Sequence, residues 1–315
     1  MSRMPAHDPL SAPALTPAQV RALSDRTTLP GLLRAATHFG AIGLTGGLIW
    51  LVITRAGLGW ALPLMALQGG LVAFLFMALH EAAHKTVFRS RRMCLVLGHL
   101  SGFLILLPYE YYCLFHWDHH RYTQDPERDP ELMTARIPAS DARLAVAYTG
   151  LLQLLARLRL HLRHAFTGRV TAPWIPPKKR GLILREVRLY LLGYLALLGL
   201  SVAAGSTLLL WTWLVPLVLG QFLLRPYLYA EHTGCAHTRS AYENTRTTYT
   251  AALVRWFAWN MPYHVEHHAY PSVPFHTLPQ LNGIIAARIR HPGRNYRAVT
   301  RETWAWFRAA RRTKA

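Results

Sequence analysis

Three stretches without a charged residue constrain the fold more than any other feature of the sequence. Residues 35–54 and 60–79 contain no Asp, Glu, Lys or Arg, and residues 189–224 continue for 36 positions without one. A helix needs about 20 apolar residues to cross a bilayer, so the first two stretches each predict one crossing. The third would be about 54 Å long at 1.5 Å per residue, and we interpret it as two short spans joined at Ala203–Thr207. The sequence therefore predicts an all-α integral membrane protein with four transmembrane helices.

The placement of basic residues indicates the orientation of these spans. Charged residues make up only 16% of the chain and the net charge is +20, which could also indicate a protein that neutralises nucleic-acid phosphates. The basic residues, however, flank the apolar stretches, as Lys and Arg do in the cytosolic loops of membrane proteins. They include Arg21, Arg26, Arg34, Lys85, Arg89, Arg91, Arg92, Lys178, Lys179, Arg180, Arg185 and Arg188. We predict no nucleic-acid partner and two cytosolic termini, with the bacterial inner membrane as the location if the chain is prokaryotic.

The chain divides into three predicted parts. Residues 1–30 hold five prolines and lack the apolar region of a signal peptide, so we expect a flexible N-terminal segment. Residues 31–290 form the predicted membrane domain, and residues 291–315 a basic C-terminal tail. Cys94, Cys113 and Cys235 are too few and too scattered for a disulfide framework, and we expect reduced thiols.

Histidine recurs in short motifs whose spacing places the rings on one face of a helix. The motifs HEAAH, HWDHH and HVEHH contain His80 and His84, then His116, His119 and His120, then His264, His267 and His268. His232 follows the fourth predicted span as His80 follows the second. A zinc site usually takes four ligands, so nine imidazoles suit two metal ions. Because imidazole binds iron, copper, nickel and zinc, the count predicts a dinuclear site without naming the metal.

The motifs can share one site only if an even number of crossings separates them. The uncharged segment Met93–Tyr109 has 17 residues, at the lower limit of a span. It contains Gly98, Gly102 and Pro108, and we interpret it as a re-entrant or interfacial helix. The stretch LLQLLARLRLHLRHAF is predicted to be an amphipathic helix on the membrane surface. With these assignments all four histidine groups lie on the cytosolic side.

The remaining histidines are predicted to have structural or surface roles, because a single histidine is usually a hydrogen-bonding residue. They are His7, His38, His99, His161, His164, His276 and His291.

The motifs HEAAH, HWDHH and HVEHH resemble the three histidine boxes of the membrane fatty acid desaturase superfamily. This superfamily also includes alkane and acyl-chain hydroxylases and carotenoid ketolases. The similarity extends from about Ala35 to Leu281. It implies four transmembrane helices, a cytosolic helical cap with a non-haem di-iron centre, and oxidation of an apolar C–H bond with O2. The resemblance carries over the eight box histidines as metal ligands. His232 resembles the additional histidine ligand of many members, and His237 competes for that role.

Carboxylates near the motifs are candidates for orienting the metal ligands, because outer-shell carboxylates often hold a ligating imidazole in one tautomer. We expect this role for Glu81, Asp118, Glu231 and Glu266. A second set of candidates comprises Asp125, Asp129, Asn244 and Asn260.

The implied reaction needs two electrons that the chain has no motif to collect. The sequence contains neither a GxGxxG motif after a strand nor a cysteine quartet. The resemblance therefore implies an external donor, a ferredoxin or similar acidic carrier with its NAD(P)H reductase. Basic residues around Arg288, Arg290, Arg294 and Arg297 could bind this donor or anionic lipid head groups.

The predicted activity is desaturation of a fatty acyl chain, an expectation that comes from the resemblance. Hydroxylation, oxidative decarboxylation to a terminal alkene, and oxidation of a carotenoid or alkane stay open as alternatives. Two other classes of function fit parts of the sequence. A zinc membrane metalloprotease would use HEAAH with Glu81 as general base, but it leaves six histidines unexplained. A metal transporter needs ionisable groups inside its spans, whereas these histidines lie beyond the span ends.

Overall fold

Long apolar helices dominate the computed structural model, which describes residues 15–313. Helix α2 (Leu29–Ala56) is followed by α3 (Leu58–Ala73), which continues after Phe74 as α4 (Leu75–His84). Together with α10 (Arg180–Ala203), these helices form the segments Leu29–Ala56, Leu58–His84 and Pro177–Ala203, which are long and apolar enough to cross a membrane. The first two match the sequence predictions.

The prediction for residues 189–224 is confirmed only in part. Helix α10 ends at Ala203 and Gly205 has a φ of 56°, so the predicted turn is present. The chain then forms a π-helical segment (Leu210–Leu214) and α11 (Val215–His232). This last helix is not among the three long apolar segments. Its second half carries Arg225, Glu231 and His232, which lower its hydropathy.

A bent helix pair provides a further candidate for the membrane. Helix α5 (Arg91–Leu104) and α6 (Tyr109–Tyr122) meet at an angle of 102°. This geometry is that of a broken span or a re-entrant loop. The described residues thus contain three helices that are long and apolar enough to cross a membrane, or four if the bent pair is counted as one span.

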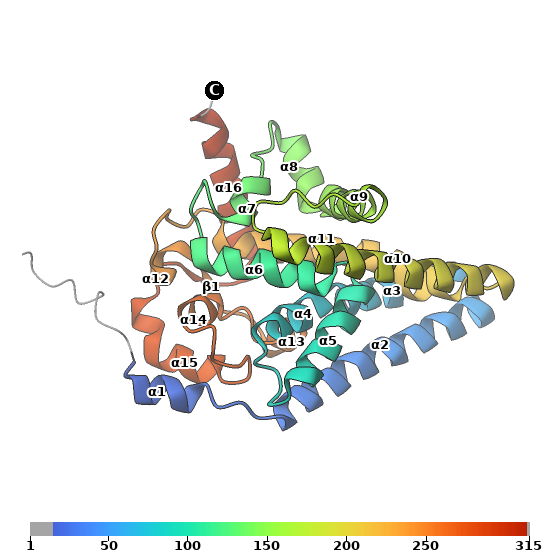
Figure 1. The fold of residues 1–315 in the computed structure, drawn as a ribbon, viewed down its shortest axis with the longest axis horizontal. Helices are drawn as coiled ribbons and strands as arrows, with labels where there is room; N and C mark the ends of the chain where they lie inside the picture. The colour runs from blue at the N-terminus through green and yellow to red at the C-terminus, as the bar shows by residue number, and fades with distance from the viewer. Residues whose placement is uncertain (1–14, 314–315) are drawn as a thin grey trace, which may run out of the picture.

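The long helices α2, α3, α10 and α11 extend together toward one side of the molecule, and short elements gather at the other (Figure 1). Helices α3 and α11 approach closely through Gly69 and Gly220. A Cβ on Gly220 would lie 2.0 Å from the Gly69 carbonyl oxygen, and one on Gly69 would lie 2.6 Å from the Pro216 oxygen. Small residues permit such close helix contacts within a membrane. This contact fixes α11, which ends at His232, against the helix that leads to His80.

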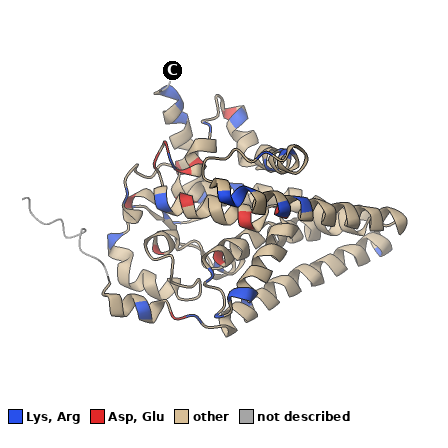
Figure 2. Cartoon of the chain, in the orientation of Figure 1, with Lys and Arg blue, Asp and Glu red and all other residues tan. Residues whose placement is uncertain are grey.

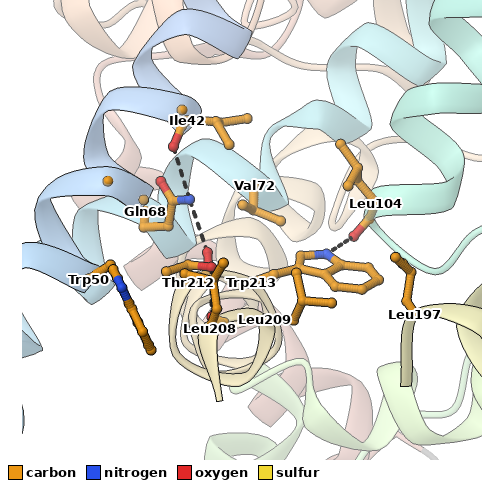
Figure 3. A pocket seen from close by; sticks show the side chains of 13 residues that line it. Ile42, Trp50, Gln68, Val72, Leu104, Leu197, Leu208, Leu209, Thr212 and Trp213 are labelled. Carbon is orange, nitrogen blue, oxygen red and sulfur yellow. Dashed lines mark hydrogen bonds between the residues drawn. The ribbon is translucent and has the colours of Figure 1, made fainter. Parts of the chain in front are cut away.

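Polar side chains join the membrane helices around an apolar cavity of about 450 Å³ (Figure 3). Gln68 Nε2 donates to the carbonyl oxygens of Ile42, at 3.2 Å, and Thr212, at 3.0 Å. Trp213 Nε1 donates to the Leu104 oxygen at 2.7 Å. The cavity lining combines residues of α2, α3, α5, α10 and the π-helical segment.

Short elements surround the ends of the long helices. They are α7 (Pro130–Thr134), α8 (Asp141–Tyr148), α9 (Leu151–Thr167), α12 (Ala241–Asn244), α13 (Ala252–Phe257), α14 (His264–Ala269), α15 (Leu278–Ile285), two 3-10 turns (Pro177–Lys179 and Ala286–Arg288), and a parallel pair of strands, β1 (Thr247–Thr248) and β2 (Pro292–Gly293). Helix α9 confirms the predicted amphipathic helix, and its outer face exposes apolar residues such as Leu155 and Phe166.

Both terminal segments contain helices that the sequence did not predict. Within the predicted flexible segment 1–30, α1 (Pro17–Leu23) begins with a capping box between Thr16 and Gln19. Its Leu23 side chain is buried. Within the predicted tail, α16 (Tyr296–Arg312) buries Val299, Thr303 and Phe307. Local capping in α1 and a periodic apolar face in α16 explain these helices. The three cysteines are free and buried.

Candidate metal centre

The first histidine motif lies at the end of α4, the continuation of a membrane helix. His80 and His84 are one helical turn apart, with ring centroids separated by 5.5 Å. Lys85 then ends the helix in a left-handed conformation with a φ of 59°. Nearly all of α4 is buried, so its backbone offers a fixed support for both imidazoles.

The second motif occupies the C-terminal half of α6, and α10 holds the opposite end of that helix. The Glu186 carboxylate accepts hydrogen bonds from the backbone N–H groups of Glu110, at 2.8 Å, and Tyr111, at 3.1 Å. A carboxylate at a helix N-terminus satisfies free N–H groups and is favoured by the helix dipole. Because Pro108 provides no side-chain cap, Glu186 takes the place of one. It thereby fixes the helix that carries the imidazoles of residues 116, 119 and 120.

The third motif forms the short helix α14. Trp259 and Asn260 precede it with φ values of 50° and 58°, and this turn redirects the chain. Trp259 is fully buried, and Asn260 donates to the Phe275 carbonyl oxygen at 3.1 Å. These contacts position α14 against α4 and α6.

Five imidazoles converge in what we call the five-histidine group, namely His80, His84, His116, His120 and His267. One nitrogen from each lies within 4.8 Å of the others. The Nε2 atoms of His84 and His116 are 2.7 Å apart, and those of His116 and His120 are 3.0 Å apart. His267 Nε2 lies 3.1 Å from His120 Nε2. The group combines ligand candidates from α4, α6 and α14.

The other imidazoles form a second cluster beside the first. Nitrogens of His119, His232 and His268 lie within 4.8 Å of one another. His264 Nε2 is 3.1 Å from His232 Nε2, and we call these four residues the four-histidine group. All nine predicted ligand residues are thus close together. His237 lies outside both groups, and its Nδ1 bonds to the Gln124 carbonyl oxygen at 2.9 Å.

The protonation state of most of these rings suits metal binding. His119 is the exception, since burial, which lowers its pKa, is outweighed by the nearby Glu131 and Asp129 carboxylates, which raise it. Burial lowers the pKa of His264, His267 and His268 well below the usual value, because a buried imidazolium loses its hydration. Neutral imidazole is the form that binds a metal. Both ring nitrogens of His80 and Nδ1 of His84 are buried and have no hydrogen-bond partner within the described structure. Unpaired buried polar atoms are costly, so this convergence fits bound metal ions.

Outer hydrogen bonds orient the rings of the four-histidine group. His119 Nδ1 lies 2.9 Å from Asp129 Oδ1, and His232 Nδ1 lies 3.1 Å from the Asn244 carbonyl oxygen. His268 Nδ1 is 3.3 Å from Thr123 Oγ1. His264 Nδ1 is 3.5 Å from Glu231 Oε1, a looser contact that does not satisfy the geometry of a hydrogen bond. Carboxylates and carbonyl oxygens in these positions commonly select the tautomer of a ligating histidine.

The four predicted carboxylates have different environments. Glu231 alone among them lies beside a motif imidazole. Glu81 accepts hydrogen bonds from Thr86 Oγ1, at 2.6 Å, and from the Phe275 backbone N–H, at 3.0 Å. Its carboxylate therefore links α4 to the segment after α14.

Glu266 and Asp118 also bind groups other than the imidazoles. Glu266 accepts hydrogen bonds from Thr247 and Asn282. Burial raises its pKa, and both hydrogen bonds oppose that shift. Asp118 is partly exposed, and its carboxylate lies 3.5 Å from Arg121.

Two residues of the second candidate set contact the imidazoles, and one contact comes from a residue the sequence did not single out. Asp129 contacts His119, and Asn244 contacts His232 through its backbone. Asp125 and Asn260 bond to other groups. The sequence analysis did not identify Thr123. Its position one helical turn beyond His119 and His120 could have indicated that its side chain lies near the imidazoles. Its hydroxyl donates to the His119 carbonyl oxygen at 2.7 Å.

The other histidines lie outside the two groups. His38 is fully buried, with Nε2 2.9 Å from the Leu71 oxygen, and its Nδ1 accepts from Trp259 at 2.9 Å. His99 contacts Tyr190, and His276 contacts Thr27. His161, His164 and His291 also lie away from the groups, and His7 is outside the described residues.

Comparison with known proteins identifies the family. Residues 57–300, more than half of the chain, match the family described as fatty acid desaturase. The protein belongs to this family. As a fatty acid desaturase family member it is an oxidoreductase of lipid metabolism, and its long apolar helices indicate an integral membrane protein.

Named desaturases are similar to this family member over most of its length. It is 29% identical over 256 residues to the sphingolipid delta(4)-desaturase DES1 of Drosophila melanogaster, covering 78% of this chain and 72% of that protein. It is 24% identical over 266 residues to the fatty acid desaturase of Bacillus subtilis, covering 77% and 71%. It is also 24% identical over 235 residues to an Arabidopsis thaliana acyl-lipid omega-3 desaturase (cytochrome b5), covering 68% of this chain and 60% of that protein.

Proposed function

We propose that the protein is a di-iron desaturase that introduces a double bond into a fatty acyl chain. The observation that carries this proposal is the pair of adjacent histidine groups, in which largely buried imidazoles from α4, α6, α11 and α14 bring ring nitrogens within 4.8 Å of one another in each cluster. Two iron ions held by these groups would supply O2-dependent oxidation of an unactivated C–H bond. In the overall reaction, two hydrogens from adjacent carbons, two external electrons and two protons reduce O2 to two water molecules.

The chain's own residues hold and orient the metal-binding groups. The five-histidine group would bind one ion and the four-histidine group the other, with His232 rather than His237 as the ninth ligand. Asp129 and the Asn244 carbonyl oxygen would hold His119 and His232 in one tautomer. Burial of both groups keeps bulk water away, and this strengthens electrostatic interactions at the site.

The fatty acyl substrate is supported by the family and by its relatives. The names of the similar proteins describe desaturases of a sphingolipid, an acyl lipid and a fatty acid. None of these names describes a hydroxylase or a decarboxylase. Desaturation is therefore the reaction we propose, within a membrane domain of residues 31–290.

We further propose that an external carrier delivers the electrons on the cytosolic side. The carrier would be a ferredoxin or similar acidic protein, reduced by an NAD(P)H reductase. Its acidic surface would complement the basic residues around Arg288, Arg290, Arg294 and Arg297. The name of the Arabidopsis relative mentions cytochrome b5, a carrier of the same functional type. Cytosolic placement of both termini and of the site rests on the basic residues that flank the membrane helices.

The decisive experiment combines metal analysis with product analysis on the purified full chain. Iron-loaded protein would be given O2, a ferredoxin system and separate panels of fatty acyl lipids, alkanes and carotenoids. We expect two irons per chain and an acyl product lighter by two hydrogens, found by mass spectrometry. An alcohol or a terminal alkene as product would contradict desaturation but would still support a di-iron oxidase. One zinc per chain would instead favour a hydrolase.

A matched pair of variants connects the result to the site. His232→Ala should lose metal and product, whereas His237→Ala should keep both, because His237 bonds to a backbone oxygen outside the groups. Equal effects of the two changes would contradict the assigned ligand set.

A further inference from the structure

Helix α2 supplies none of the nine clustered imidazoles, yet one of its side chains holds two of the segments that lead to them. The helix is almost free of charge (Figure 2). His38, in its third turn, is fully buried. Its Nε2 lies 2.9 Å from the Leu71 carbonyl oxygen, and its Nδ1 lies 2.9 Å from Trp259 Nε1. The ring therefore lies between the end of α3 and the turn that precedes α14.

These two contacts determine the tautomer of the His38 ring. An indole N–H can only donate a hydrogen bond, and a carbonyl oxygen can only accept one. Trp259 therefore donates to an unprotonated Nδ1, and Nε2 carries the proton that is donated to the Leu71 oxygen. An imidazolium has N–H groups at both positions and could not accept from Trp259. His38 is thus a neutral ring with both nitrogens satisfied, whereas both ring nitrogens of His80 lack a partner among the described residues.

The bond to Leu71 stabilises the break between α3 and α4. Leu71 lies in the last turn of α3, where carbonyl oxygens lack the regular helical donors. At the break the Met77 N–H bonds to the Phe74 oxygen at 3.0 Å, and this spacing of three residues is that of a 3-10 turn. The chain then continues as α4, which carries the first histidine motif. By holding the end of α3, His38 fixes where α4 begins.

The bond to Trp259 anchors the turn that leads to the third histidine motif. Trp259 and Asn260 have φ values of 50° and 58°, which are unfavourable for residues other than glycine. Such a backbone persists only where the surrounding structure holds it. The Trp259 side chain is held by His38 on α2 and by the Phe275 ring, whose centroid is 5.1 Å away. Because α14 begins five residues after Trp259, this anchor also sets the position of α14.

A second side chain of α2, one turn before His38, contacts the same part of the chain. Arg34 donates to the Trp256 carbonyl oxygen at 2.7 Å, and its guanidinium lies 5.5 Å from the centroid of the Phe275 ring. The Phe275 backbone N–H in turn donates to the Glu81 carboxylate on α4 at 3.0 Å. Contacts therefore connect α2 to the turn before α14, that segment to α4, and α2 to the start of α4.

We propose that His38 is a positioning residue for the metal centre, and that it fixes the first and third histidine motifs relative to each other. Its ring binds no metal, but its two hydrogen bonds hold the segments from which α4 and α14 begin. Ligands that come from different segments must be held within about 0.5 Å of their working geometry by the residues that support them. This role rests on the proposed metal centre, and it assigns to a membrane helix without ligands the task of aligning those that carry them.

Three variants of His38 separate its two hydrogen bonds. In His38→Gln the side-chain amide can reach the position of Nε2 and keep the bond to Leu71. In His38→Asn the side-chain oxygen lies near the position of Nδ1 and can keep the bond to Trp259. His38→Phe keeps a ring and removes both bonds. The iron affinity of the purified full chain, measured by competition with a chelator, should fall about two- to tenfold in each amide variant and further in His38→Phe, because a buried hydrogen bond is lost in each case.

The two amide variants should differ in which ion they weaken. Loss of the bond to Leu71 in His38→Asn displaces α4, which supplies histidines to the five-histidine group alone, so a chelator should remove one of the two ions more readily. Loss of the bond to Trp259 in His38→Gln displaces α14, which supplies histidines to both groups, so both ions should be weakened. Trp259→Phe removes the same bond and should reproduce the result of His38→Gln. The same pattern of metal loss in His38→Asn and His38→Gln would contradict the proposal.

Ile49→Ala is the matched control for a general loss of stability. Ile49 is fully buried on the same helix but belongs to a separate core cluster. Its truncation leaves a cavity and should lower the melting temperature, while iron affinity stays within about twofold of the wild type. If Ile49→Ala weakens iron binding as much as His38→Phe, stability rather than positioning explains the effect, and the proposal is overturned.

The remaining outcomes separate this role from the proposed function. Wild-type protein that binds iron, together with unchanged iron affinity in the His38 variants, would overturn the positioning role alone. Wild-type protein that binds no metal would overturn the proposed metal centre and this role with it. If His38→Phe is not monodisperse by size exclusion, the two amide variants, which each keep one hydrogen bond, provide the test.

Discussion

The two histidine groups lie side by side, yet they are held in place differently. In the five-histidine group, Nδ1 of His84 and Nδ1 of His267 are buried and have no partner among the described residues. In the four-histidine group, His119, His232 and His268 each have an outer hydrogen-bond partner. The first group thus depends on the packing of α4 and α6, and the second on hydrogen bonds from loops. Changes to outer partners should therefore affect the second group selectively.

The largest expected effect comes from removing one proposed ligand from each group. His84→Ala leaves four candidate ligands in its group, whereas His232→Ala leaves three in the other. Both should reduce product formation at least about 100-fold. Loss of an outer hydrogen-bond partner already lowers metal affinity or activity by about 10–100-fold, and loss of a ligand itself should cost more. Metal content per chain, measured by mass spectrometry, should fall further in His232→Ala. Equal metal loss in the two variants would contradict independent binding by the two groups.

The next effect concerns the outer carboxylate of the four-histidine group. Asp129→Asn should lower metal affinity or product formation by about 10–100-fold, because Asp129 fixes His119 at 2.9 Å. In this variant a chelator should remove the ion of the four-histidine group, whereas the ion of the five-histidine group, about half of the bound metal, should be retained. Asp118→Asn is the matched control, since Asp118 lies in the same region but is partly exposed beside Arg121. If Asp118→Asn reduces activity as much as Asp129→Asn, the proposal that outer hydrogen bonds hold the four-histidine group in place is contradicted.

What the groups share is burial, and this predicts the pH dependence of the metal-free protein. Burial lowers the pKa of His264, His267 and His268, so each of these rings binds fewer protons in the folded chain than in the unfolded one below about pH 6.5. Their contribution to the stability of the apoprotein should therefore fall as pH decreases from 6.5, by at most about 1.4 kcal/mol per pH unit for each ring. The buried carboxylates Glu231 and Glu266, whose pKa burial raises, offset part of this loss. Thermal unfolding between pH 8 and pH 5 measures this. A melting temperature that does not change over this range would contradict buried neutral imidazoles.

The comparison also shows what the sequence could predict. Helical spacing was sufficient to predict that the histidines of each motif lie close together, because rings three or four residues apart share a helix face. The same geometry excludes Asp118, which is two residues from both His116 and His120 and so lies on the opposite side of α6. Asp129 was harder to identify, because its contact with His119 depends on the loop between α6 and α7. The sequence could not show which of His232 and His237 lies beside the other imidazoles. In the structure His232, at the end of α11, lies beside His119 and His264, and His237 does not.

The smallest effect tests whether a single hydroxyl contributes to the four-histidine group. Thr123 Oγ1 lies 3.3 Å from His268 Nδ1 and donates to the His119 carbonyl oxygen at 2.7 Å. Thr123→Val keeps the shape but removes both contacts, and a lost hydrogen bond costs about 0.5–1.5 kcal/mol. We expect product formation and metal affinity to fall by about two- to tenfold, with Thr123→Ser close to wild type because it keeps the hydroxyl. If Thr123→Ser and Thr123→Val behave alike, packing rather than hydrogen bonding holds His268. The four-histidine group would then depend on packing in the same way as the five-histidine group.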